Sequence, residues 1–425
     1  MERLKKINSI CNIITIALLI LYLNIGTAIL IFFKLSYLEF SYGLYIFGTL
    51  ALIQYIVFKI LNKERIILKD LFILLLIFFL IISYLFAYKK NDALFGVITR
   101  NEGLFSLVSY YALYLLASTI NVKSQRKLLN IFLFTGFIQI TIGVMQTMQI
   151  TNILGYDRSL NWSTNFKFAS GTLGNPNFYS TYILMCALYS LGRLLENKNF
   201  GWIIIFLIFV SGLIIGNTTS CMIAFILCFF AVLIKKINKK NIKKVFFTLV
   251  ISSVVIICSL SFFDKFVNHR ISYTMNKNIN EIREIFKNGI TDSTGNYRVY
   301  IWRNTISKIP EYFLTGIGID NFSYINDGHY LCAGDKNYQC FDKAHNEYLQ
   351  ILITDGVITF LIYISFIVYI LITSKNCLKG TKFAVYGYLI QALFNISVIQ
   401  VAPIFYVLLG FMSYKSKLDT EVTHE

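Results

Sequence analysis

Charged residues are scarce in this chain, since only 14% of its 425 residues are Asp, Glu, Lys or Arg, whereas soluble domains carry about 25%. Proline is scarcer still, with 3 in the whole chain, which excludes collagen-like and proline-rich linker proteins. The 56% of residues that are apolar fall in long runs that a soluble core could not hide. The sequence therefore predicts an all-α, polytopic membrane protein in which residues 1–425 form one membrane domain.

A helix that crosses a bilayer needs about 20 mainly apolar residues. That criterion selects about twelve spans, the last two of which are short and could form one broken span. They lie at residues 10–33, 43–61, 70–87, 103–120, 128–149, 176–195, 201–217, 220–234, 245–263, 355–373, 383–398 and 402–414. Between the ninth and tenth spans, residues 264–345 are predicted to form one large loop.

Lysine and arginine are unevenly distributed over the short loops, and short loops rich in them stay in the cytoplasm. With the N-terminus inside, the inner segments hold most of the 39 basic residues. We therefore predict that both termini are cytoplasmic and that the large loop, residues 264–345, is extracytoplasmic. Because the net charge of +17 largely reflects this topology, we predict membrane lipids but no nucleic acid as partners.

The sequence has no phosphate-binding loop, no dinucleotide glycine fingerprint and no HExxH zinc motif, so we expect neither a cofactor nor a metal. The predicted spans are almost free of Asp and Glu, which disfavours an ion-coupled transporter. In an oxidising exterior Cys332 and Cys340 could close a small disulfide loop, although the sequence does not decide whether they do. Polar residues gather instead on the predicted outer side of the membrane.

Two of these polar stretches precede predicted spans. Arg100 lies at the outer mouth of the fourth span, where it either pairs with Glu102 to anchor a helix or binds an anionic lipid headgroup. Asn175 is a good N-cap and Pro176 suits the first position of a helix. A helix that begins there points free N–H groups outward, which makes either an anion site for a lipid phosphate or an ordinary helix start.

The large loop contains two predicted helices. Ile279, Ile282 and Phe286 recur at helical spacing with basic residues between them, which predicts an amphipathic helix on the membrane surface. On the next helix Arg298 and Trp302 share a face, so the indole could hold the guanidinium through a cation–π contact.

A histidine lies where the large loop leads into the tenth span. Asp342 is predicted to cap the helix there, which places His345 in its first turn. Since a helix N-terminus disfavours imidazolium, His345 should stay neutral and able to accept a proton. A purely structural histidine is the alternative interpretation.

Three motifs, in this order, resemble the O-antigen ligase and O-antigen polymerase family, whose members share an O-antigen ligase-related domain. They are Gly171-x-x-Gly174-Asn175-Pro176-Asn177, then Arg298-x-x-x-Trp302 leading to Pro310 and Gly316-Ile317-Gly318-x-x-Asn321-Phe322, and finally Ala344-His345-Asn346-Glu347-Tyr348-Leu349-Gln350. The resemblance covers about residues 90–375. It implies a GT-C-like membrane glycosyltransferase of cell-surface polysaccharide biosynthesis, inverting and metal-independent. Such an enzyme moves a glycan from an undecaprenyl diphosphate carrier to a hydroxyl of a glycan or surface-lipid acceptor, at the outer face of the cytoplasmic membrane.

The resemblance also implies roles for particular residues. Arg298 would bind the diphosphate and His345 would activate the acceptor hydroxyl. The other expected substrate contacts are Arg100, Asn175, Asn177, Trp302, Arg303 and Asn346. The chain departs from the family at residues 217–221, which lack an arginine that many members carry, so that Arg100, Arg158 or Arg303 would have to replace it, or the activity would differ.

Other classes remain open at this stage. A lipid-linked glycan flippase or transporter would also be polytopic and basic, and a non-catalytic scaffold would leave Arg298 and His345 as structural residues. A peptidoglycan-type polymerase would need an outer carboxylate, for which Asp320 or Asp335 would serve. The sequence does not separate polymerase from ligase. Its abundance of Ile, Lys and Asn suggests an AT-rich genome, which weakly favours a cell without lipopolysaccharide.

Overall fold

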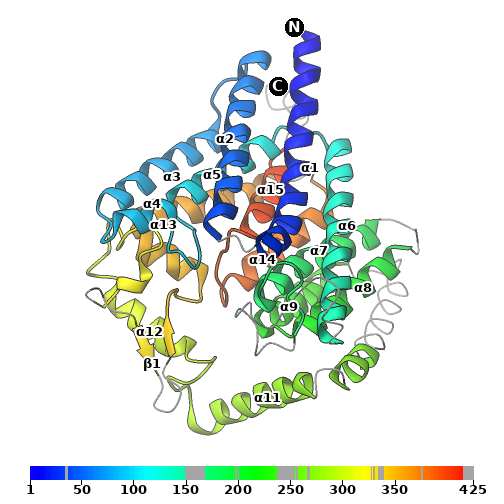
Figure 1. The fold of residues 1–425 in the computed structure, drawn as a ribbon, viewed down its shortest axis with the longest axis vertical. Helices are drawn as coiled ribbons and strands as arrows, with labels where there is room; N and C mark the ends of the chain where they lie inside the picture. Colours follow the sequence, from blue (N-terminus) through cyan, green and yellow to red (C-terminus); the bar gives the residue numbers. More distant parts are fainter. Residues whose placement is uncertain are drawn as a thin grey trace.

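The computed structural model of the chain describes residues 1–33, 37–148, 168–196, 199, 201–236, 254, 257–265, 269–326, 328, 331–333, 339–374 and 377–414. Helices dominate these residues, and one very short antiparallel pair of strands accompanies them (Figure 1). The elements are α1 (Glu2–Phe33), α2 (Tyr37–Asn62), α3 (Leu68–Leu85), α4 (Lys90–Phe95), α5 (Leu104–Ala117), α6 (Val122–Thr147), α7 (Pro176–Glu196), α8 (Gly201–Gly216), α9 (Thr219–Lys236), α11 (Arg270–Asn288), α12 (Arg298–Lys308), η2 (Phe322–Tyr324), β1 (Leu331–Ala333), β2 (Gln339–Phe341), α13 (Glu347–Thr373), α14 (Lys379–Gln391) and α15 (Ala402–Met412).

Among the described helices, α1, α2, α3, α6 and α13 are long and apolar enough to cross a membrane, and α5, α8, α9 and α15 are shorter apolar helices. Side chains such as Ile46, Ile53 and Phe78 are more than half exposed on α2 and α3, as expected where lipid replaces water. An all-α, multi-pass membrane protein is therefore confirmed. The count of about twelve spans remains a prediction, and most of the predicted span 245–263 lies outside the described residues.

Helix α7 forms the centre of the bundle. It packs along α14 and α8 and also contacts α9 and α6, and all but a few of its residues are buried. Its buried side chains include Ser180, Thr181 and Ser190, and small polar residues of this kind suit contact with other helices rather than with lipid. Because α7 begins at Pro176, directly after Asn175, this central position also fixes the predicted outward helix start.

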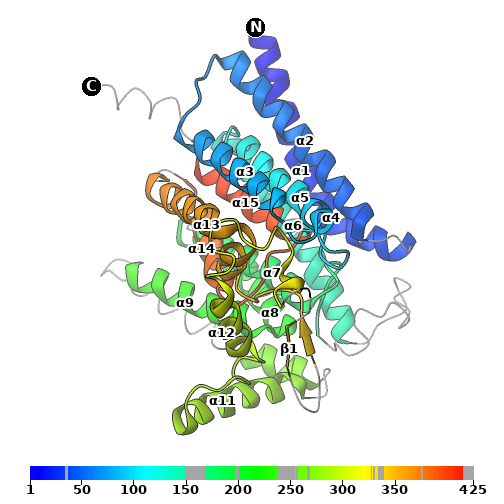
Figure 2. The same ribbon diagram turned by 90° about the vertical axis from the view of Figure 1, so that its left-hand side faces the viewer.

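The predicted extracytoplasmic elements lie together at one end of the molecule. In both views α11, α12 and β1 are at the end opposite to the start of α1 (Figures 1 and 2). The N-terminus and the large loop thus lie at opposite ends of the molecule, and which end is cytoplasmic remains a prediction from the charge distribution.

Helix α13 is broken at Gly356, whose φ of 84° and ψ of 165° are not helical. The chain from residue 313 to residue 318, here called segment 313–318, lies beside the break and satisfies the backbone groups that the break leaves unpaired. The bonds run from Ile317 N to Ile353 O (3.0 Å), from Gly318 N to Thr354 O (2.9 Å) and from Val357 N to Phe313 O (2.8 Å). The large loop therefore enters the bundle rather than merely covering it.

One predicted span is wrong in its extent. The span expected at 383–398 ends as helix α14 at Gln391, and residues 392–401 form an irregular connection, here called connection 392–401. Asn395 explains this ending, because its Oδ1 accepts from the N–H of Ile396 at 3.0 Å and its Nδ2 donates to Gln391 Oε1 at 2.9 Å. Such local side-chain bonds compete with helical ones.

The close packing at the break predicts a specific sensitivity to Gly316→Ala. Gly316 has a φ of +71°, and a Cβ there would meet the carbonyl oxygen of Thr354 at 2.1 Å. The strained backbone alone costs about 1–3 kcal/mol, and the clash adds to it. Gly289→Ala is the matched control, because Gly289 has a φ of +78° with nothing within 4 Å. Thermal unfolding of the purified protein should show a larger loss of Tm for Gly316→Ala, and equal losses would contradict this packing.

Candidate functional site

Lys343 is a buried cation that joins three distant parts of the chain. Its Nζ lies 2.6 Å from Asp320 Oδ1, in the loop before η2, and 3.2 Å from Glu102 Oε2, just before α5. Burial disfavours the ammonium, but the carboxylates of Asp320 and Glu102 outweigh it and raise the pKa of Lys343. Glu102 Oε1 also accepts from Tyr110 and from Ser397, at 3.1 and 2.6 Å.

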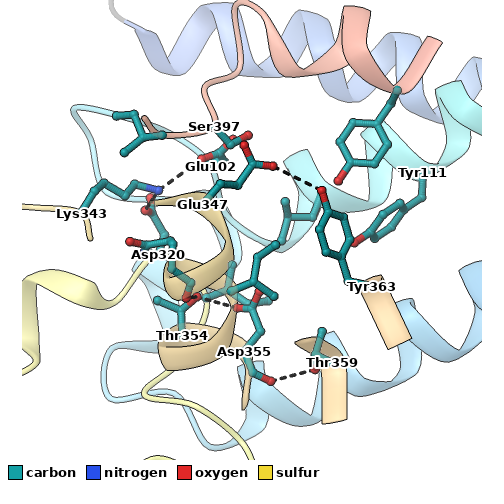
Figure 3. Close-up of a pocket in the computed structure, with 16 residues that line it drawn as sticks. Glu102, Tyr111, Asp320, Lys343, Glu347, Thr354, Asp355, Thr359, Tyr363 and Ser397 are labelled. Atoms are coloured by element: carbon teal, nitrogen blue, oxygen red, sulfur yellow. Dashed lines mark hydrogen bonds and ion pairs between the residues drawn. The ribbon is translucent and has the colours of Figure 1, made fainter. Parts of the chain in front are cut away.

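A cavity of about 50 Å³ lies beside this cluster (Figure 3). Its polar lining includes Glu102, Asp320, Lys343, Glu347 and Asp355. A buried water needs at least about 10–15 Å³, so the cavity has room for a few waters. The cluster therefore joins the outer segments around a small polar cavity.

The residues around Lys343, from Asp342 to Glu347, are here called segment 342–347, and most of them have a fixed partner. Arg100 binds Asp342 through Nε at 2.7 Å and through its second nitrogen at 3.3 Å. Burial opposes a charged carboxyl, yet the Arg100 guanidinium holds the pKa of Asp342 below its usual range. Glu347 accepts from Tyr388 at 3.0 Å.

The predicted cap and the predicted ion pair at these positions are both wrong. Asp342 does not cap α13, since Asn346 does so by accepting from the N–H of Leu349 at 3.0 Å. Arg100 pairs with Asp342 rather than with Glu102. Asn346 is the better cap because it stands directly before the helix, whereas Asp342 finds a charged partner that an N-cap position could not offer.

His345 lies before the first turn of α13, not within it, and its backbone has a positive φ of 49°. Its side chain is half-buried. Burial, and then the positive charge of Arg298, lower the pKa of the His345 imidazole to about 4. His345 is therefore neutral near pH 7, as the sequence predicts, but because of burial and a nearby cation rather than a helix terminus.

Arg298 is the first residue of α12, and backbone carbonyls hold it. Its guanidinium donates to Gly295 O at 2.8 Å and to Phe394 O at 3.2 Å. Among the described residues, no carboxylate is within ion-pair distance of Arg298, and Glu281 acts on it only from farther away. Two of its five N–H groups are thus used, and its charge is not neutralised by a direct partner.

The other two predicted arginines differ from Arg298. Arg100 is paired with Asp342, and Arg303 is paired with Asp292 at 2.7 Å on a largely exposed side chain. The structure therefore brings Arg298 and Arg100 into the electrostatic surroundings of His345, whereas the contact recorded for Arg303 lies elsewhere. Arg158, also considered as a replacement, lies outside the described residues.

Trp302 joins α12 to segment 342–347. Its indole N–H donates to Ala344 O at 3.1 Å, and its ring lies 6.3 Å from that of Phe394. The predicted cation–π contact with Arg298 is not formed among the described residues. Trp302 instead holds the residue before His345, so it positions the histidine relative to the arginine.

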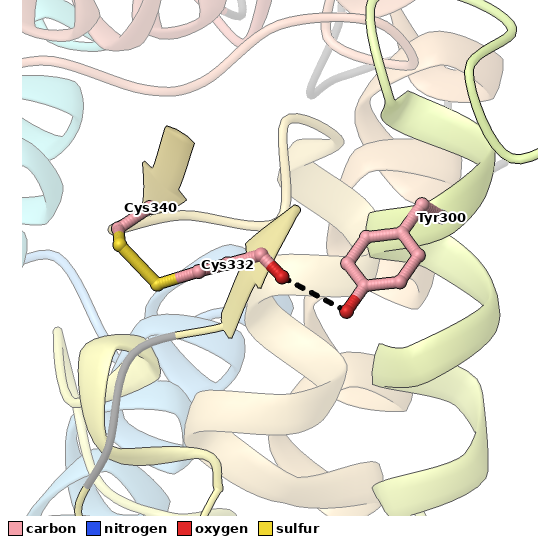
Figure 4. Close-up of a disulfide and its surroundings, with 3 residues drawn as sticks. All are labelled: Tyr300, Cys332 and Cys340. Carbon is pink, nitrogen blue, oxygen red and sulfur yellow. Dashed lines mark hydrogen bonds between the residues drawn. A yellow bond between two sulfur atoms is a disulfide. The ribbon is translucent and has the colours of Figure 1, made fainter. Parts of the chain in front are cut away.

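A small hairpin supports α12 from its other side. Cys332 and Cys340 face each other across β1 and β2 and form a disulfide, which answers the question that the sequence left open. The hydroxyl of Tyr300 on α12 donates to Cys332 O at 3.0 Å (Figure 4). The hairpin thus ties the helix that carries Arg298 to the chain just before segment 342–347.

Asn175 caps α7, as predicted, by accepting from the N–H of Asn177 at 2.8 Å. No direct contact of Asn175 or Asn177 with Arg298 is recorded in the described part of the chain. The two regions are instead joined through the end of α14. Thr181 of α7 donates to Gln391 at 3.4 Å, Asn395 donates to the same oxygen, and the preceding Phe394 accepts from Arg298.

Sequence reasoning missed two contributors to this site. Lys343 stands directly before the motif that contains His345, and a lysine between Asp and Ala near the start of a predicted span indicates an ion pair. Phe394 acts through its carbonyl oxygen, so its residue type carries no signal at all. Its position was moreover predicted to be part of a transmembrane span.

A comparison with known protein families shows which family part of the chain resembles. Residues 204–364 match the family described as O-antigen ligase, and no curated protein matches the chain. The matched region contains Arg298, Trp302, Arg303, His345 and Asn346, whereas Arg100, Asn175 and Asn177 precede it. The chain is thus a multi-pass membrane protein similar to the O-antigen ligases, and the resemblance carried by its motifs is confirmed over that region. A role of the ligase or polymerase type in cell-surface polysaccharide is supported.

The buried ion pairs predict that Lys343→Met will destabilise the protein strongly. It leaves Glu102 and Asp320 buried without their cation, and breaking a buried pair in this way costs about 3–5 kcal/mol. Lys308→Met is the matched control, because the pair of Lys308 with Glu311 lies at the surface, with 26 and 46% of the two side chains exposed, and should matter little. Denaturant unfolding in detergent measures both, and similar small losses would show that Lys343 does not hold the site together.

Proposed function

We propose that the protein is a membrane glycosyltransferase of the O-antigen ligase or polymerase type. It transfers a glycan from an undecaprenyl diphosphate carrier to an acceptor hydroxyl at the outer face of the cytoplasmic membrane. The observation that carries this proposal is the combination of Arg298, which has no carboxylate partner among the described residues, with a neutral His345 close enough for their charges to interact.

Arg298 binds the diphosphate of the donor in this proposal. As the bond from the sugar to the diphosphate breaks, its electron pair goes to the phosphate oxygen, and negative charge grows on the leaving group. A fixed cation stabilises that charge more in the transition state than in the ground state. The donors come from the protein itself, so we propose that no metal takes part.

His345 is the general base. It accepts the proton of the acceptor hydroxyl while that oxygen attacks the anomeric carbon from the face opposite to the diphosphate, which inverts the configuration. Of the two cations that lower the pKa of His345, Arg298 has the larger effect and Arg100 the smaller. A diphosphate bound to Arg298 offsets this positive charge, so donor binding raises the pKa of His345 and makes it a stronger base.

Four of the remaining predicted residues are proposed as substrate contacts. The start of α7 at Asn175 and Asn177 offers free N–H groups to an anion, and it reaches Arg298 through Gln391 and Phe394. Asn346 uses only its oxygen as a cap, which leaves its amide nitrogen for a sugar hydroxyl. Arg100 can bind phosphate when a phosphate oxygen replaces the Asp342 carboxylate as its partner.

Replacement of His345 tests the general base. His345→Gln should lower turnover about 10²- to 10⁴-fold while donor binding remains. For the wild type, kcat/KM should stay constant from neutral pH downward and fall only near the pKa of about 4, because the base works while it is deprotonated. The acid limb of kcat should lie at higher pH, since bound diphosphate raises this pKa.

The measurement is glycan transfer from a purified lipid-linked donor. His269→Gln is the control, because His269 is exposed and paired with Asp264 at 3.1 Å. A well-folded His345→Gln protein with nearly normal turnover would assign His345 a structural role.

Replacement of Arg298 tests the diphosphate site. Arg298→Lys keeps the charge but loses the planar fork that binds two phosphate oxygens, so transfer should be impaired, and more so in Arg298→Ala. The defect should appear in kcat as well as in KM, because the stabilisation grows as the leaving group departs.

Two controls accompany this measurement. Arg303→Lys changes an arginine of the same helix that is paired with Asp292 and should have a smaller effect. Transfer by the wild type should persist in EDTA. Full activity of both Arg298 variants would remove Arg298 from the site, and abolition by EDTA alone would refute the metal-free mechanism.

A further inference from the structure

One side of helix α11 binds the rest of the protein through polar side chains. Thr274 accepts from Asn217 at 2.9 Å, and Asn278 donates to Thr219 at 3.2 Å. Farther along the helix, Lys277 Nζ donates to the side chain of Asn296 at 2.7 Å, and Glu281 accepts from the N–H of Gly295. These contacts face the start of α9 and the turn that precedes Arg298.

A second side of α11 is apolar and uncovered. Met275, Ile279, Ile282 and Phe286 are exposed by 43, 44, 53 and 88%. At 3.6 residues per turn these four side chains fall within an arc of about 60°, roughly a third of a turn away from the residues that bind the protein. An apolar row of this kind is unfavourable in water and indicates a surface that something covers.

The position of α11 suits a membrane surface. In both views the helix lies across the end of the molecule that carries the large loop, opposite to the start of α1 (Figures 1 and 2). A helix that lies across the spanning helices at the end of the bundle lies in the plane of the bilayer interface.

Charge along the edge of the apolar row indicates what covers it. Arg283 and Lys287 are exposed and follow the row on the side away from Glu281. Within the described part of the chain, the side-chain contact of Arg283 is a weak one with Asn280, at 3.4 Å. Basic side chains beside an apolar face are the arrangement that binds anionic lipid headgroups while apolar side chains enter the acyl boundary.

We propose that α11 is an interfacial helix whose row Met275, Ile279, Ile282 and Phe286 lies among the lipids of the outer leaflet, with Arg283 and Lys287 on anionic headgroups. Through Lys277 and Glu281 the same helix holds the turn at Gly295 and Asn296, and Gly295 O holds Arg298. The lipid surface therefore sets the height of Arg298 above the bilayer. This last consequence rests on the proposed function, whereas the lipid contact does not.

Photo-crosslinking tests the lipid contact directly. A photoreactive p-azidophenylalanine replaces Phe286 in one variant and Glu284, about 160° away around the helix, in the matched control. The full-length protein is reconstituted in vesicles of phosphatidylglycerol and phosphatidylcholine, irradiated, and examined by mass spectrometry. Lipid adducts should form at position 286 several times more often than at position 284.

Two outcomes would overturn the proposal. Equal or absent lipid adducts at position 286 would show that the row does not face lipid, and covalent dimers at that position would show that a second copy covers it. The adducts should also contain more phosphatidylglycerol than its share of the vesicle, and Arg283→Gln with Lys287→Gln should abolish that enrichment. Adducts without any enrichment in the unmodified helix would refute the assignment of anionic headgroups. These readouts need no glycan transfer, so they remain informative if the proposed function fails.

Discussion

The arrangement of the outer segments depends on one buried ammonium group. Lys343 lies between Glu102 and Asp320, residues that belong to stretches of chain far apart in the sequence. Apolar packing between helices in a membrane specifies such a register weakly, since one aliphatic side chain packs much like another and lipid competes equally well. A buried cation has few alternatives, because any shift of the chain leaves at least one charge without a partner. The ion pairs therefore give segment 342–347 a defined position above the bundle.

This defined position accommodates Arg298 and His345, the two groups that we propose act on substrate, although the surroundings of both are unfavourable. Carbonyl oxygens of Gly295 and Phe394 orient Arg298 without neutralising it, whereas a carboxylate would compete with the phosphates of a donor. His345 has a positive φ and a depressed pKa, and neither condition would persist unless its neighbours were fixed. Lys343, Ala344 and Asn346 all have partners. The left-handed backbone of His345 and the charge of Arg298, which has no carboxylate partner among the described residues, thus lie in surroundings whose own polar groups have fixed partners.

Sequence reasoning predicted the features that depend on neighbours along the chain. The apolar runs gave most of the helices, Asn175 was recognised as a cap, and the row of Ile279, Ile282 and Phe286 was recognised as amphipathic. The failures have two causes, which are a partner far away in the sequence and local side-chain bonds. Asp342 looked like a cap because Arg100, more than two hundred residues away, is invisible to local rules. The span at 383–398 looked continuous because the side-chain bonds of Asn395 are not apparent from hydropathy.

The break in α13 explains why a loop of this kind can form a site at the membrane surface. A continuous spanning helix satisfies its own backbone and offers no entry to another segment. At Gly356 the helix no longer pairs all of its own backbone groups, and segment 313–318 supplies hydrogen-bond partners for them. That segment leads directly to Asp320, the partner of Lys343, so the loop is attached at the break and at the ion pair a few residues later. Beyond Lys343, Trp302 of α12 binds Ala344, the residue before His345. Arg298 binds Gly295, and Gly295 binds Glu281 of α11, the helix with the exposed apolar row. The candidate site is therefore attached on one side to the interior of the bundle and on the other side to α11, whose apolar row we propose lies in lipid.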